Sequence, residues 1–213
     1  MKVKIKKEGN TKEFNLIKSW SDVTLEKWIR LIELENKDKS FEAEATIKLL
    51  SDIPKKLIRE LGIQDVAKLM SRIGELQANA TVGLKNIIKI DGVEYGFHPD
   101  LEDITLGEWA DIETFIKAGI EKNLPEIMAI LYRPIKEKKN DAYIMGAYDG
   151  NIAVRAEKFK KMSAEQVQGA LVFFWSFAIV SLKILPSFLM EQVNKKGQII
   201  MEKISQKNGA TSE

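Results

Sequence analysis

The sequence predicts a mainly α-helical protein with small β-hairpins, an α+β fold in which a hairpin-plus-helices unit occurs twice and a long apolar C-terminal helix follows. Three observations predict this fold. Alternating segments flank turn residues in two places, and apolar residues recur at helical spacing elsewhere. In addition, the segment Asp22-Val-Thr-Leu-Glu-Lys-Trp28 returns 81 positions later as Asp103-Ile-Thr-Leu-Gly-Glu-Trp109.

The first unit is expected over residues 1–80. Val3 and Ile5 alternate with lysines before the turn residues Glu8-Gly9-Asn10, which predicts a hairpin over residues 2–17. Apolar spacing predicts the helices that follow, and Pro54 suits the start of a short one. The predicted helices are 24–35, 41–50, a short helix from Pro54 to about Leu61, and 64–78.

The second unit is expected over residues 81–204 and opens with the strongest hairpin signal of the chain, Asp91-Gly92. Thr105 and Glu108 then form a capping box at a helix start. A further helix is predicted over 126–132, ending before Pro134. The anchors Phe14/Tyr95, Leu16/Phe97, Thr24/Thr105 and Trp28/Trp109 share one offset, which favours a duplication over chance likeness between two ordinary segments.

Residues 134–151 mix basic and aromatic side chains, as a single-strand nucleic-acid binder does. The residues in question are Lys136, Lys138, Lys139, Tyr143 and Tyr148. Acidic residues, namely Glu137, Asp141 and Asp149, dilute this charge. A solvated loop is therefore the favoured interpretation.

Ser163 and Gln166 form a second capping box, which opens the most apolar part of the chain at residues 169–185. The uninterrupted apolar run is shorter than the roughly 20 residues that cross a bilayer, so a buried helix is expected and no membrane contact. Pro186 is expected to kink or divide this helix. An amphipathic segment over 193–204 and a disordered tail over 205–213 complete the prediction.

Aromatic residues crowd the apolar helix. Three consecutive aromatics cannot all face one side of a helix, so one or more must meet a second layer of the same chain or a partner. The candidate partner-binding residues are Phe173, Phe174, Trp175 and Phe177.

Composition narrows the class of protein. The net charge of +2 is too close to neutral for a dedicated nucleic-acid binder. The chain has no cysteine, which excludes disulfides, thiolate catalysis and cysteine-based zinc sites. The N-terminal residues lack a signal-peptide core, so a cytoplasmic protein is expected.

No catalytic or cofactor-binding motif stands out. The only histidine, His98, lies near Asp100, Glu102 and Asp103, but one imidazole without a second soft ligand does not predict a metal site. The acidic run is expected instead to favour the positive N-terminus of the helix that starts at Thr105. The sequence therefore predicts neither metal, cofactor nor enzymatic activity, although an enzyme using the acidic surface over residues 100–111 stays an alternative.

Several segments together resemble small helical proteins of tailed bacteriophages, those described as tail assembly chaperones or as virion proteins of unassigned role. The segments are Tyr95-Gly-Phe97, Pro99-Asp-Leu101, Thr105-Leu-Gly-Glu-Trp109-Ala-Asp-Ile-Glu113, Met128-Ala-Ile-Leu-Tyr-Arg-Pro-Ile135 and Gly169-Ala-Leu-Val-Phe-Phe174. The first unit departs from the pattern, with Glu26 for Gly107 and Lys27 for Glu108.

The resemblance implies a non-enzymatic role in virion morphogenesis: a tail assembly chaperone in the host cytoplasm that shields an aggregation-prone partner. The implied partners are phage tail or other virion proteins, with a homo-oligomer possible and no nucleic acid. The alternative is a structural component of the particle, such as a connector, ring or baseplate protein.

Overall fold

The structure is a computed structural model that describes residues 1–7, 10–35, 37–80, 83–181 and Gln198. The first half contains β1 (Lys2–Lys7), β2 (Asn10–Asn15), the 3-10 helix η1 (Trp20–Asp22), α1 (Leu25–Leu34), α2 (Lys39–Leu50), α3 (Lys55–Arg59) and α4 (Ile63–Ala78). The second half contains β3 (Ile87–Ile90), β4 (Val93–Phe97), η2 (Leu101–Asp103), α5 (Leu106–Gly119), η3 (Ile120–Asn123), α6 (Leu124–Leu131), β5 (Tyr132–Lys139), β6 (Ala142–Met145), α7 (Ile152–Phe159) and α8 (Ala164–Ser181). The predicted mixed α+β class is confirmed.

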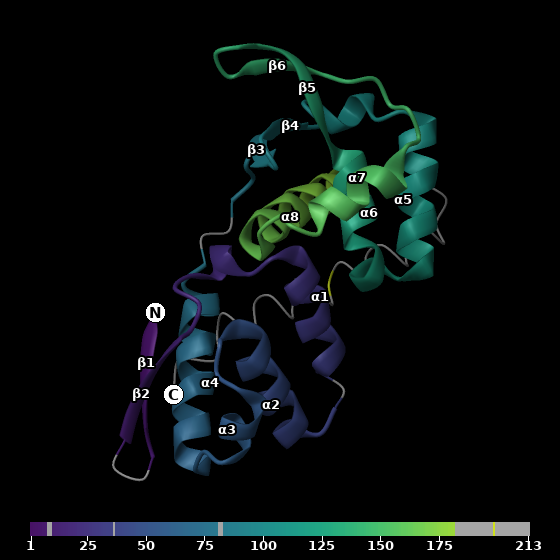
Figure 1. Cartoon of the computed structure of the whole chain (residues 1–213). Helices are drawn as coiled ribbons and strands as arrows, with labels where there is room; N and C mark the ends of the chain where they lie inside the picture. The colour runs from purple at the N-terminus through teal and green to yellow at the C-terminus, as the bar shows by residue number, and fades with distance from the viewer. Residues whose placement is uncertain (8–9, 36, 81–82, 182–197, 199–213) are drawn as a thin grey trace.

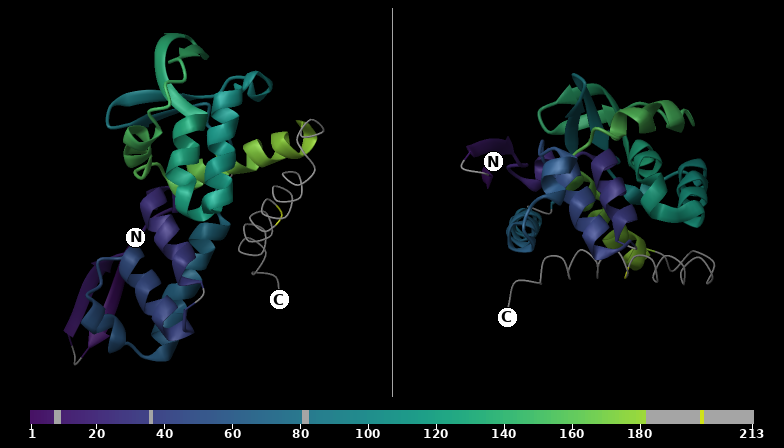
Figure 2. Two further views of the ribbon diagram at one scale, coloured as in Figure 1. Left: turned by 90° about the vertical axis from the view of Figure 1, so that its right-hand side faces the viewer. Right: turned by 60° about the horizontal axis from the view of Figure 1, so that its bottom comes forward.

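Two antiparallel sheets lie at opposite ends of the molecule (Figure 1, Figure 2). One is the hairpin β1–β2, and the other has the strand order β3-β4-β5-β6. The hairpin predicted at Asp91-Gly92 is present, and both turn residues have positive φ, 49° and 83°. Asp and Gly tolerate this left-handed conformation better than other residues, which is why the pair is a reliable turn signal.

Helix α8 links the two halves (Figure 1). It contacts η1 and α1 of the first half, while its Phe173 and Phe174 rings pack on Phe97 and Trp109 of the second. The contact is close at Gly169, where an added Cβ would lie 2.2 Å from the carbonyl oxygen of Gly83. No helix among the described residues is both long and apolar enough to span a bilayer.

The two halves share backbone geometry at a spacing of 81 residues. Ile17 N–H donates to the Leu50 carbonyl at 3.0 Å, and His98 N–H donates to the Leu131 carbonyl at 2.8 Å. The bridge Leu16↔Ser51 has its counterpart in the pair Phe97↔Tyr132. The 3-10 helices η1 and η2 and the first residues of α1 and α5 occupy matching positions.

The helix starts match as well. Thr24 caps α1 and Thr105 caps α5, and each hydroxyl oxygen accepts the amide of the residue three positions on at 3.3 Å. Trp28 and Trp109 occupy the same position in the two helices. The backbone N–H of each donates to the backbone carbonyl of the capping threonine at 2.9 Å. The division of the chain at residue 80 stays a prediction.

One segment was predicted wrongly. Residues 134–151 are not simply a solvated loop, because 132–139 and 142–145 pair as β5 and β6. The hairpin extends the sheet by pairing β5 with β4, and Asn140 makes its turn at a φ of 55°. The Tyr143 hydroxyl donates to the Phe97 carbonyl at 2.7 Å, and its ring occupies the space above Gly96.

Only part of the predicted C-terminal region lies within the described residues. Ser163 and Gln166 exchange hydrogen bonds of 3.2 Å each, as the predicted capping box requires, and α8 follows. The rest of the expected apolar helix, the kink at Pro186, most of the segment 193–204 and the tail 205–213 lie outside the described residues.

Candidate functional site

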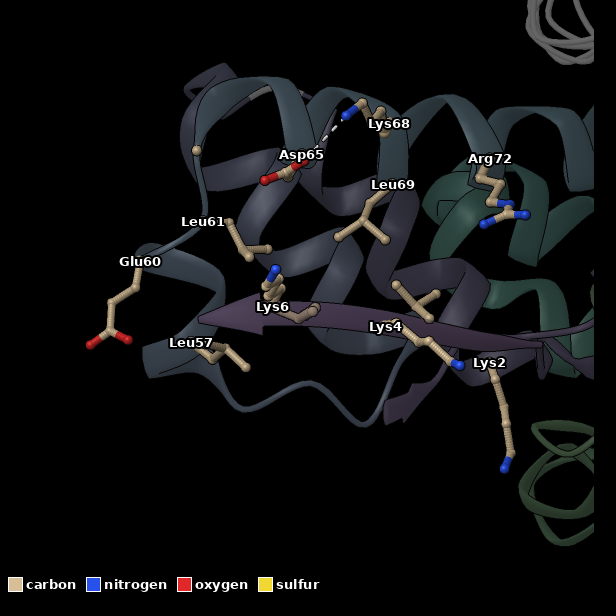
Figure 3. Close-up of a pocket in the computed structure, with 13 residues that line it drawn as sticks. Lys2, Lys4, Lys6, Leu57, Glu60, Leu61, Asp65, Lys68, Leu69 and Arg72 are labelled. Atoms are coloured by element: carbon tan, nitrogen blue, oxygen red, sulfur yellow. Dashed lines mark hydrogen bonds and ion pairs between the residues drawn. The ribbon is translucent and has the colours of Figure 1, made fainter. Parts of the chain in front are cut away.

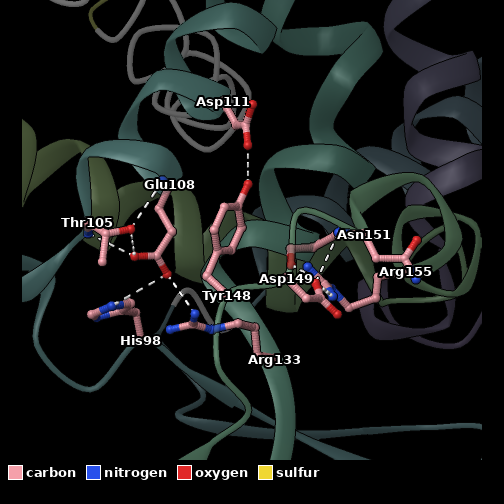
Figure 4. Close-up of polar contacts among 10 residues, drawn as sticks. His98, Thr105, Glu108, Asp111, Arg133, Tyr148, Asp149, Asn151 and Arg155 are labelled. Carbon is pink, nitrogen blue, oxygen red and sulfur yellow. Dashed lines mark hydrogen bonds and ion pairs between the residues drawn. The ribbon is translucent and has the colours of Figure 1, made fainter.

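The first turn of α5 carries a cluster of buried charged side chains (Figure 4). The backbone N–H and the hydroxyl of Thr105 both donate to Oε2 of Glu108, at 2.8 and 2.7 Å. The predicted capping box is confirmed, but Glu108 does more than cap the helix. Its side chain is only 1% exposed, so its carboxylate needs charged or polar partners inside the protein.

Two further side chains approach this carboxylate. Nη1 of Arg133, at the start of β5, lies 2.8 Å from Oε1 of Glu108. Nε2 of His98, just after β4, lies 3.9 Å from the same oxygen. Burial lowers the pKa of His98, while the negative charge of Glu108 opposes that shift. Burial likewise lowers the pKa of Arg133 against the opposing effect of Glu108.

A second layer of polar contacts extends from this cluster. The Tyr148 hydroxyl donates to Asp111, one turn after Glu108, and burial together with this bond raises the tyrosine pKa. The Arg133 guanidinium lies 6.0 Å from the centroid of the Tyr148 ring, within the range of a cation–π contact. The segment that follows β6 is thereby attached to α5.

Arg155 of α7 secures the other end of that segment. Its Nη1 lies 2.5 Å from Asp149, and its Nε donates to the Ala129 carbonyl at 3.2 Å. The hydrogen bond from Arg155 lowers the pKa of Asp149. The strands, α5, α6 and α7 are thus tied together by side chains from residues 98–155.

The fold does not require the charge cluster, as the first half demonstrates. At the positions equivalent to Glu108, Arg133 and His98 it has Lys27, Asp52 and Ile17, yet it forms the same backbone bonds. Burying charged side chains is costly, and apolar residues of similar volume often serve stability equally well. The cluster therefore distinguishes the local chemistry of the second half from that of the first.

The two halves also differ in what covers the first helical turn. In α1, the N–H groups of Leu25 and Glu26 donate to the Met162 and Lys160 carbonyls at 2.7 and 3.0 Å. Ala164 N–H returns a bond of 2.7 Å to the Val23 carbonyl, and Leu25 is 0% exposed. The connection between α7 and α8 thus lies across the start of α1 like a short added strand.

The equivalent turn of α5 is open. Leu106, the counterpart of Leu25, is 84% exposed. Within the described part of the chain, neither Leu106 N–H nor Gly107 N–H has a hydrogen-bond acceptor, as expected of first-turn amides without a covering segment. An exposed apolar side chain and two amides without an acceptor among the described residues thus lie in the helical turn that also carries Glu108.

The aromatic residues of α8 divide between core and surface. Phe174 and Trp175 are each 1% exposed, so a partner reaches them only if α8 moves. Phe173 is 46% exposed, and its ring meets Phe97 edge-on with centroids 5.6 Å apart. The side chain of Phe177 lies outside the described residues. The role of the four in partner binding stays a prediction, and among the three with described side chains Phe173 is the one exposed to a partner.

The acidic run after His98 has a local role. Asp100 accepts the Glu102 N–H at 2.9 Å and so caps η2, a short helix that precedes α5. The run was expected to favour the N-terminus of α5, which stays a prediction; Glu108 is a carboxylate that forms a hydrogen bond there, with the Thr105 N–H. No group of three potential metal-ligating side chains occurs within the part of the chain that the structure describes.

Sequence reasoning identified Glu108 as a cap but missed its burial and its pairing with Arg133. The pairing joins residues from a helix start and a distant strand, and no local spacing indicates it. Leu106, Trp109 and Ile112 recur at helical spacing, which predicts that they face one side of their helix, whereas the structure buries Ile112 and exposes Leu106. The comparison with Leu25 explains the error, because burial at this position depends on a covering segment.

Comparison of this chain with protein-family models, with curated proteins and with solved structures gives no significant match.

Proposed function

We propose that this chain is a non-enzymatic protein-binding factor, a phage tail assembly chaperone acting in the host cytoplasm. One observation carries the binding role: the first turn of α5 is the open counterpart of a turn that is covered in α1. A partner segment that runs across α5 as residues 160–164 run across α1 would bury Leu106 and accept both free amides. The phage context rests on the resemblance of roughly residues 86–180 to such proteins.

The segments that carry this resemblance pack around one another. Strand β4 pairs with β5, α5 packs on α6, and α8 places Phe174 against Trp109 with ring centroids 6.5 Å apart. They include Glu108 and Arg133 of the charge cluster. This supports a single binding region in the second half, whose partner is a phage tail or other virion protein or a second copy of the chain.

We further propose that residues 1–80 and 83–135 derive from one hairpin-plus-helices unit by duplication. The support is the recurrence of the same backbone hydrogen bonds, 3-10 helix and threonine cap at one spacing. The first copy then binds its own chain through the start of α1, and the second copy keeps the equivalent surface for a partner.

Substitution of Leu106 tests the binding role. Leu106→Glu should lower the yield of a co-expressed tape-measure or tail-tube protein encoded by a neighbouring gene by at least about tenfold, the loss of one hot-spot contact. Stability should change by no more than about 0.5 kcal/mol, since the side chain is exposed. The measurement is co-purification from the soluble fraction, with thermal unfolding in parallel.

Ile63 offers a matched control. It is the first residue of α4, as Leu106 is of α5, and it is 83% exposed. Ile63→Glu should leave co-purification unchanged. Equal yields from wild type and Leu106→Glu would refute the proposed site. A structural particle protein, the alternative, would be found in finished particles at a fixed copy number, whereas a chaperone is absent from them.

A further inference from the structure

A groove in the first half lies beside the edge of β1 that faces away from β2 (Figure 3). Within the described residues, strand β1 pairs only with β2. Met1 and Leu16 exchange two backbone bonds, of 2.5 and 2.7 Å, and the register then alternates along the hairpin. The backbone groups of Lys2, Lys4 and Lys6 therefore point away from β2, along the free edge.

The groove has a volume of about 680 Å³ and separates β1 from α3 and α4. Five apolar side chains line it: Val3, Ile5, Leu57, Leu61 and Leu69. Figure 3 shows Leu61 and Leu69 pointing into the space between α4 and β1. An apolar floor beside free backbone donors and acceptors is the arrangement that recognises an extended peptide by strand addition.

The charge of the lining is predominantly positive. Lys2, Lys4 and Lys6 come from β1 and Lys68 and Arg72 from α4, against two acidic residues, Glu60 and Asp65. Lys68 pairs with Asp65 at 3.4 Å, and Lys2 and Lys4 share Glu13. Among the described residues, Lys6 and Arg72 have no ion-pair partner.

Lysines on an edge strand also serve to prevent edge-to-edge aggregation. That role explains Lys2, Lys4 and Lys6 but not the cations on the facing helix, since α4 has no strand edge to protect. Positive charge on both walls of an apolar groove indicates a negatively charged occupant. None of the described lining residues is an aromatic on which a base would stack, which favours a peptide over a single-stranded nucleic acid.

We propose that this groove binds an acidic extended peptide of a partner protein, which adds to β1 as a third strand. Its carboxylates alternate with apolar residues, so that one set meets the lysines and Arg72 while the other lies on the apolar floor. A segment of about six residues matches the length of β1. The surface is separate from the start of α5, and the proposal does not depend on the proposed function.

A fluorescently labelled peptide of three Glu-Val repeats, with both ends blocked, tests the proposal against the full chain by fluorescence anisotropy. It should bind, and a Lys-Val peptide of equal length should not. Lys6→Glu combined with Arg72→Glu should weaken binding by about tenfold or more. Lys89→Glu combined with Lys139→Glu, an equal charge change on exposed residues of the second sheet, should leave binding unchanged.

Two N-methylated forms of the peptide test strand addition without altering the protein. Methyl groups on one alternating set of amides should abolish binding, and those on the other set should not, because only one set faces β1. Absence of binding at millimolar peptide, or equal binding by the Lys-Val peptide or by both N-methylated forms, would overturn the proposal. Tighter binding of an oligo-thymidine than of the Glu-Val peptide, lost in the double variant, would assign the groove to nucleic acid instead.

Discussion

Glu108→Gln should destabilise the protein by about 3–5 kcal/mol, the usual cost of removing one partner of a buried ion pair. The substitution keeps the volume of the side chain but leaves the Arg133 guanidinium buried without a counter-charge. It also replaces a charged acceptor of the Thr105 N–H and hydroxyl by a neutral one. Chemical denaturation followed by circular dichroism measures the loss.

Two further variants test whether the loss of stability in Glu108→Gln comes from the buried ion pair with Arg133. Glu113→Gln on the same helix removes an exposed pair with Lys117 and should cost less than about 1 kcal/mol. The double variant Glu108→Leu/Arg133→Met replaces both charges by apolar groups and should recover much of the lost stability. A loss below about 1 kcal/mol for Glu108→Gln would mean that water reaches the cluster.

Gly169→Val should be the second strongly destabilising change. The new side chain would meet the backbone of Gly83, whose carbonyl oxygen and carbon lie 2.2 and 2.6 Å from the position of an added Cβ. Because a backbone cannot rotate away as a side chain can, α8 or the segment at residue 83 must shift. Such overpacking costs about 1–3 kcal/mol or more, measured again as a free energy of unfolding.

Gly74 provides the opposite case. It lies within α4, and an added Cβ there would meet nothing within 4 Å. Gly74→Ala should therefore stabilise the protein by about 0.5–1 kcal/mol through the better helix propensity of alanine. If Gly169→Val and Gly74→Ala changed stability equally, the close approach of α8 to residue 83 would be wrong.

Elements with strong local signals were predictable from the sequence. The Asp91-Gly92 turn, the caps at Thr24, Thr105 and Ser163, and the helices over 24–35 and 64–78 all depend on residues within one turn of each other. The sequence match at a spacing of 81 residues could also be found from the sequence, because the residues that match are cap and core residues.

Features that depend on distant residues were not predictable. The β5–β6 hairpin projects beyond the core, so its strands lack the apolar alternation by which strands are recognised. Helix α7 was also missed, although its buried Phe159 packs on Tyr95 and Tyr132. The pairing of Glu108 with Arg133 joins α5 to β5 and has no local signature.

The difference between Leu25 and Leu106 illustrates the same limit. Both residues open a helix after a capping threonine, and their sequence contexts are nearly identical. One is fully buried and the other 84% exposed, because residues 160–164 lie across α1 only. Exposure at this position is therefore a property of the whole fold, and it is the basis of the proposed partner site.

Amide hydrogen exchange at the two helix starts tests this account most directly. In the free chain, the N–H groups of Leu106 and Gly107 should exchange rapidly, while those of Leu25 and Glu26, bonded to Met162 and Lys160, should be protected. In a complex with the partner protein, Leu106 and Gly107 should become protected to a similar degree. Protection of Leu106 and Gly107 in the free chain, or their unchanged rapid exchange in the complex, would contradict the central claim.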